Sequence, residues 1–196
     1  MEQNLYPLRA ALAVAGSSPG RFHNHVGSGA VDCALALIGD ADAHLTPPRR
    51  GAGAGTGGGR LISAAATVAA AIAFQIMPRG VSAADAFKIA GTFTFLGEMG
   101  DGLRAFVPGG TAAPRPAGGL FPADLGDTFL AVLPAALDAP QGPAFAFVPG
   151  RDLTAPAIIA WAGERDLDAG AVLLLNLSAL VVEVLDGLRA IDPGTH

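Results

Sequence analysis

The chain has almost no cysteine: Cys33 is the single one among 196 residues. One thiol cannot form an internal disulfide, and it excludes a zinc site made of four thiolates. The first ten residues, MEQNLYPLRA, also lack the basic start and the apolar run of a secretory signal. We therefore expect a cytoplasmic protein in a reducing compartment.

Long hydrophobic runs are scarce as well, although 51% of the residues are hydrophobic. A membrane-spanning helix needs about 20 mostly apolar residues. The longest run, residues 61–77, is shorter and contains three polar residues, and the run at residues 171–185 is interrupted in the same way. We interpret both runs as buried elements and expect no contact with a membrane.

Charge is sparse and unevenly placed. Charged residues make up 15% of the chain, Lys88 is the single lysine, and the net charge is −5. Residues 1–90 carry seven basic against five acidic residues, whereas residues 91–196 carry five basic against twelve acidic residues. Two halves of opposite sign indicate two roles.

The first half shows the pattern of a helix–turn–helix unit. Pro7 can open a helix in which apolar residues recur at helical spacing, and Gly16 is a natural stop. Ser18 is a favourable N-cap for a second helix over residues 19–26. The tripeptide Gly16-Ser17-Ser18 would then be the tight turn between two short helices.

The second of these helices carries side chains that can bind DNA. Phe22 and Val26 are expected to pack on the first helix. The polar side chains around them, which can bond phosphates and base edges, are then turned outward: Arg21, His23, Asn24, His25 and Ser28. A short helix set against another by a tight turn fits the DNA major groove.

A projecting wing is predicted next. Residues 44–59, HLTPPRRGAGAGTGGG, are too rich in proline and glycine for regular structure, and we expect the tip at residues 51–59 to be mobile. Arg49 and Arg50 precede this tip and Arg60 follows it. Arginines beside the tip of a hairpin can reach phosphates or a minor groove.

Two more helices follow the wing. Ser63 can cap a helix that runs to about Ile76. Ser82, with Asp85 as its capping-box partner, can cap another whose apolar face reaches Phe93.

The remainder of the chain has the pattern of an acidic α+β unit. Strands are expected at residues 128–133, 144–148 and 171–175, and a closing helix over residues 178–190. Residues 153–161 are ambiguous, because Pro156 is tolerated only in the first turn of a helix. We expect Trp161 to anchor the core of this unit.

The order of features over residues 7–95 resembles the winged helix-turn-helix of MerR-like regulators. The resemblance is carried by Ser18, Arg21, Gly29, Pro48, Arg50, Gly59, Arg60, Ser63, Gly80, Val81 and Ser82. It implies that Arg21 and its neighbours lie in the major groove, and that Arg50 and Arg60 contact backbone phosphates.

We therefore predict a mainly α protein with a small β component. A winged helix-turn-helix domain at residues 1–95 is followed by a Gly/Pro-rich linker at 96–119 and a small α+β domain at 120–196. The predicted function is a transcription regulator that is not an enzyme, needs no cofactor and binds double-stranded DNA as a homodimer, because half-site recognition favours two-fold symmetry. The acidic half would supply dimerisation or contact with a protein partner.

Two alternatives remain open. The helices could belong to a protein-interaction or phage-derived assembly module without DNA binding, or the acidic half could house an enzyme or ligand site. Support for a ligand site is weak in the sequence. Gly53, Gly55 and Gly58 are spaced as in a dinucleotide fingerprint but lack the strand that precedes it. The spacing of the four candidate zinc ligands matches no standard site: His23, His25, Cys33 and His44.

Overall fold

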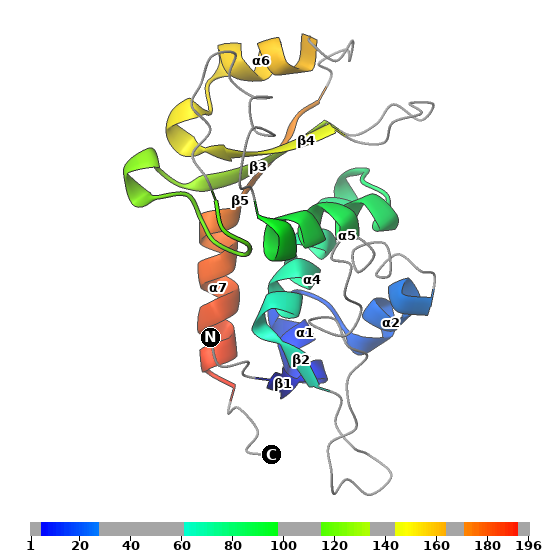
Figure 1. The fold of residues 1–196 in the computed structure, drawn as a ribbon. Helices are drawn as coiled ribbons and strands as arrows, with labels where there is room; N and C mark the ends of the chain where they lie inside the picture. The colour runs from blue at the N-terminus through cyan, green and yellow to red at the C-terminus, as the bar shows by residue number, and fades with distance from the viewer. Residues whose placement is uncertain (1–4, 28–60, 98–114, 134–143, 164–170, 192–196) are drawn as a thin grey trace, which may run out of the picture.

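The computed structural model describes residues 5–27, 61–97, 115–133, 144–163 and 171–191, which form a layer of helices beside a small antiparallel sheet (Figure 1). This arrangement confirms the predicted fold class, mainly α with a small β component. Over these five ranges, no helix is both long enough and apolar enough to pass through a bilayer.

The N-terminal helical hairpin forms as predicted. Helix α1 (Leu8–Val14) is followed by Gly16, whose φ of 70° is the left-handed conformation that ends many helices. Helix α2 (Pro19–Gly27) begins after Ser18, and the Oγ of Ser18 accepts a hydrogen bond from the backbone N–H of Arg21 at 3.4 Å. A bond from the N–H of Ser17 to the carbonyl of Leu12, at 2.8 Å, closes the turn.

No sequence pattern predicts the two-stranded ladder beneath this hairpin. Strand β1 (Leu5–Pro7) pairs antiparallel with β2 (Leu61–Ser63), with Tyr6 opposite Ile62. A wing would pair the strand after the glycine tip with a strand just before the tip, whereas the partner of β2 among the described strands precedes α1. The winged arrangement therefore stays a prediction.

Helix α4 (Ala64–Ile76) is the central helix of the layer. The Oγ of Ser63 caps it by accepting the N–H of Ala66 at 3.1 Å, as predicted. Most of its side chains are buried, because α1, α5 and α7 pack around it and its many alanines let these neighbours come close.

A 3₁₀ turn, η1 (Met77–Arg79), leads to α5 (Ala83–Gly91). The predicted N-cap is confirmed, since the Oγ of Ser82 accepts the N–H of Asp85 at 3.2 Å. The same Oγ donates to the Asp85 carboxylate at 2.6 Å, a bond between side chains where a full capping box would bond the carboxylate to the backbone N–H of Ser82. The helix continues as a π-helix, η2 (Thr92–Leu96), in which Phe93 is fully buried.

The sheet contains β3 (Thr128–Leu133) at its centre, between β4 (Ala144–Pro149) and β5 (Leu173–Asn176), all antiparallel. The short 3₁₀ turns η4 (Ala123–Leu125) and η5 (Gly150–Asp152) precede β3 and follow β4. Side chains alternate along β3: Leu130 and Val132 face the helical layer, and Ala131 and Leu133 face the opposite side.

Helix α6 (Ala155–Gly163) covers that opposite side of the sheet (Figure 1). Pro156 lies in its first turn, which resolves the ambiguity of this segment in favour of a helix. Trp161 is buried against the sheet and anchors this smaller core, as predicted.

Helix α7 (Leu177–Arg189) starts directly from β5. Asn176 ends the strand and caps the helix, with its Oδ1 accepting the N–H of Ala179 at 2.9 Å. The helix runs along α4 and α1, and Gly187 permits this approach, since a Cβ there would lie 2.6 Å from Cγ1 of Val14.

The main buried core is shared by the two halves of the chain. One contiguous cluster joins Leu12 of α1 and Ile72 of α4 to Leu130 of β3 and Val184 of α7. Side chains from both sides of residue 95, where the sequence pattern places a domain boundary, are therefore buried in the same core.

Candidate nucleic-acid interface

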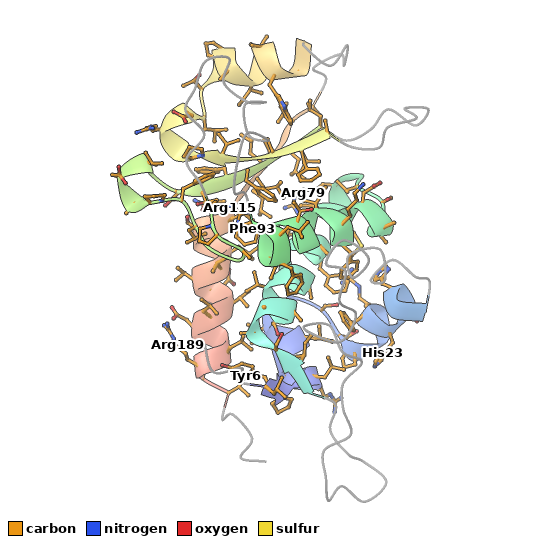
Figure 2. All side chains as sticks on the ribbon, viewed as in Figure 1. Tyr6, His23, Arg79, Phe93, Arg115 and Arg189 are labelled. Atoms are coloured by element: carbon orange, nitrogen blue, oxygen red, sulfur yellow. The ribbon has the colours of Figure 1, made fainter. Side chains whose placement is uncertain are left out.

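Helix α2 lies at the edge of the helical layer, and Figure 2 labels His23 on it. Its inner side chain, Phe22, is 5% exposed. The ring of Phe22 meets the ring of Phe87 edge-on at 6.3 Å, and Phe87 meets Phe74 in the same way at 6.0 Å. These three rings, called the aromatic cluster below, join α2 to α4 and α5.

Arg21 is exposed, and its guanidinium rests on one ring of the aromatic cluster. Its Cζ lies 5.0 Å from the centroid of the Phe74 ring, which is a cation–π contact. Phe74 is 6% exposed, so one face of a buried ring supports a side chain at the surface. Asn24, three residues further along the helix, is also exposed.

The two histidines of α2 are half-buried. The ring of His23 meets the edge of Phe22 at 6.2 Å. The ring of His25 lies 5.8 Å from Phe74 and 5.9 Å from Phe87. The sequence pattern places His25 on the outer face of α2. The structure places it against the cluster instead, because His25 follows Phe22 by three residues and so lies on the same side of α2, where it meets the rings of Phe74 and Phe87.

The remaining predicted DNA contacts lie outside the described residues: Ser28, Arg49, Arg50 and Arg60. The same holds for the glycine tip at residues 51–59, for the fingerprint-like glycines, and for Cys33 and His44. In the parts of the chain that the structure describes, no three potential metal ligands come together.

Formal charge separates along the described segments as it does along the sequence. In residues 5–27 and 61–97, four basic residues stand against one acidic residue. The four are Arg9, Arg21, Arg79 and Lys88, all exposed. In the described residues from 115 to 191, three basic residues stand against five acidic ones. The surplus of positive charge is therefore in the part of the chain that contains α2.

The sequence pattern did not identify Phe74 as a residue of this surface. It lies off the apolar stripe that Val68, Ile72 and Ile76 form along α4 at a spacing of four residues. An aromatic residue outside the main apolar stripe is a signal for a second packing face. Phe74 uses that face to contact α2.

A second cationic side chain, Arg115, lies inside the segment predicted as a linker, and it is wholly buried. Its guanidinium sits between the rings of Phe93 and Phe147, with its Cζ 4.4 and 4.7 Å from their centroids. Nη1 donates hydrogen bonds to the carbonyls of Gly119 at 2.9 Å and of Phe93 at 3.1 Å. Figure 2 shows Arg115 beside Phe93, between the helical layer and the sheet.

The backbone around Arg115 is equally close-packed. Gly97 has a φ of 65°, and a Cβ there would lie 2.5 Å from the backbone nitrogen of Ala117. The N–H of Gly118 donates to the carbonyl of Phe93 at 2.9 Å. Residues 115–119 are therefore part of the packed structure, and the role of Arg115 is to join the helices to the sheet.

Comparison with known proteins finds no match: no protein-family model, no curated protein and no solved structure is similar to this chain.

Proposed function

We propose that this protein is a cytoplasmic, DNA-binding transcription regulator of the MerR-like type and not an enzyme. The observation that carries the proposal is the placement of Arg21 and Asn24, both exposed and one helical turn apart on the short second helix of a tight hairpin. Arginine and asparagine are the side chains that most often read guanine and adenine in the major groove.

In this proposal α2 enters the major groove of double-stranded DNA, and the arginines of the wing hold phosphates on either side. Arg49, Arg50 and Arg60 then contribute affinity without sequence preference, because phosphate contacts position a protein but carry no base information. The acidic second half stays away from the DNA.

The test compares Asn24→Ala with Arg60→Ala. Asn24→Ala is expected to weaken binding to a selected duplex by roughly 1–3 kcal/mol and to relax the preference at particular base pairs. Arg60→Ala is expected to weaken binding to all sequences about equally and to lower the salt slope by about one unit. Both are measured by titration of a selected and a scrambled duplex at two salt concentrations.

Arg189→Ala is the control, because this exposed residue lies on α7 in the acidic half and pairs with Asp186 at 2.7 Å. It should leave DNA affinity unchanged. A result in which Asn24→Ala alters neither affinity nor preference would contradict the placement of α2 in the groove.

We further propose that the protein is a homodimer whose copies meet through α6. This helix, APAIIAWAG, has no polar side chain apart from the indole of the buried Trp161, and its outer face includes Ile159, which is 64% exposed. A surface helix that is apolar on both faces is typical of a buried interface. Two-fold symmetry also suits the reading of two half-sites.

Ile159→Glu is expected to raise the dimer dissociation constant at least about a hundredfold, since each two-fold contact loses both copies of an apolar side chain worth about 1.5–3 kcal/mol. Sedimentation equilibrium measures this constant. Val182→Glu is the matched control, because Val182 is 53% exposed on α7. Equal dissociation by both variants, or none by Ile159→Glu, would contradict an α6 interface.

The same apolar face supports the second candidate, a protein-interaction or assembly module without DNA binding. In that case α6 binds a different protein and α2 has no nucleic-acid partner. The two candidates separate by salt, because phosphate binding weakens steeply as salt rises and an apolar protein interface does not.

A further inference from the structure

We infer that Phe74 sets the base preference of this protein by fixing the guanidinium of Arg21, so that Arg21 reads a guanine in the base pair next to the one that Asn24 reads. The inference rests on the proposed function and adds a residue that never touches DNA. Phe74 is a positioning residue in this scheme, and Arg21 makes the contact.

The Phe74 ring is a rigid support for the guanidinium of Arg21. Phe74 is 6% exposed within the central helix α4, and its ring packs edge-on against Phe87 at 6.0 Å with an interplanar angle of 83°. Because the Phe74 ring is packed on its other sides, it stays in place when the Arg21 side chain moves. An unrestrained arginine side chain loses about 2 kcal/mol of rotamer entropy when DNA binding orders it. An arginine that already contacts a ring loses less.

The contact between Arg21 and Phe74 does not use the hydrogen-bond donors of the guanidinium. The contact at 5.0 Å uses the charge of the guanidinium and the face of the ring. Among the described residues, the Arg21 side chain forms no hydrogen bond or ion pair. Its fork of N–H donors matches O6 and N7 of guanine, the commonest specific contact in the major groove.

The spacing of Arg21 and Asn24 along α2 matches the spacing of neighbouring base pairs. Arg21 and Asn24 are three residues apart, which is about 4.5 Å along a helix axis. Successive bases on one DNA strand are about 3.4 Å apart. The two side chains therefore reach neighbouring base pairs, and since asparagine pairs with N6 and N7 of adenine, the expected core is a G·C pair beside an A·T pair.

The experiment selects bound duplexes from a random library with the full chain and then measures affinities for single-base variants of the selected site. Wild type should select adjacent G·C and A·T pairs. Phe74→Leu keeps an apolar side chain but removes the ring, and should lower the preference for the G·C pair about fivefold while the A·T preference and the salt slope remain. Arg21→Lys should lower the G·C preference about tenfold or more.

Phe121→Leu is the matched control, because it makes the same change at a phenylalanine that is equally buried, 6% exposed, but lies outside the aromatic cluster. It should retain the G·C preference. Thermal melting by circular dichroism checks that both leucine variants fold. If Phe74→Leu does not fold, Phe74→Met, which also removes the ring but keeps an adaptable apolar side chain, makes the same test.

The failures of the two proposals differ. If wild type binds no duplex, the proposed function is overturned. If wild type binds a selected site and Phe74→Leu keeps the full G·C preference, or Phe121→Leu loses as much of it, the positioning role of Phe74 is overturned and DNA binding stands. Selection of a core without a G·C pair would likewise overturn the role of Arg21 as a guanine reader.

Discussion

Replacement of Arg115 with alanine is expected to lower the free energy of unfolding by about 3–5 kcal/mol. The wild-type guanidinium fills the space between Phe93 and Phe147 and donates to carbonyls of Phe93 and Gly119. Alanine leaves a cavity between the helical layer and the sheet and removes these charge-assisted bonds. Urea unfolding followed by circular dichroism gives the difference.

Two further variants test the physical reason. Arg151→Ala removes an exposed arginine whose ion pair with Asp152 spans 3.4 Å, and it should change stability by less than about 0.5 kcal/mol. Arg115→Met restores much of the volume, and the carbonyl of Phe93 still accepts the N–H of Gly118, so its loss should be smaller than that of Arg115→Ala. A loss below about 1 kcal/mol for Arg115→Ala would contradict the joining role.

The isolated fragment of residues 1–97 is expected not to fold. In the whole chain α7 packs on α4, α1 and β3 and buries five side chains in the shared core: Leu177, Leu180, Val181, Val184 and Leu188. Each contributes roughly 1.5–3 kcal/mol by burial, and their sum reaches the whole stability of a typical domain, about 5–15 kcal/mol. The fragment should show no cooperative thermal transition, whereas the whole chain should unfold in one.

This result decides between the shared core and the division predicted from sequence, in which residues 1–95 fold alone. Two calorimetric transitions in the whole chain, or a cooperative melt of the fragment, would favour two domains. Adding a separate chain of residues 115–196 tests the cause. If the missing cover explains the failure, the mixture should regain helical signal that neither piece has alone.

The local features of this protein were determined by the sequence itself. Ser18, Ser63 and Ser82 cap the helices that they were predicted to cap, because a serine oxygen and the N–H groups it accepts lie within one turn. The alternation along β3 is equally local. The exposure of Asn24 and the burial of Phe22 follow from helical spacing over a few residues.

Only the tertiary structure decided which distant segments meet. Three-residue strands such as β1 and β2 carry no readable pattern, and their pairing joins residues more than fifty positions apart. Helical spacing puts His25 on the same side of α2 as Phe22, but only the packing of α4 and α5 decided that it meets the rings of Phe74 and Phe87.

Arg115 shows the same limit most clearly. A charged residue between prolines in a glycine-rich stretch has every local property of an exposed linker. Its burial became favourable because Phe93, 22 residues earlier, and Phe147, 32 residues later, supply ring faces, and nearby carbonyls accept its hydrogen bonds. The sequence determined where helices and strands begin, and long-range packing decided what they enclose, since burial depends on partners that no local window contains.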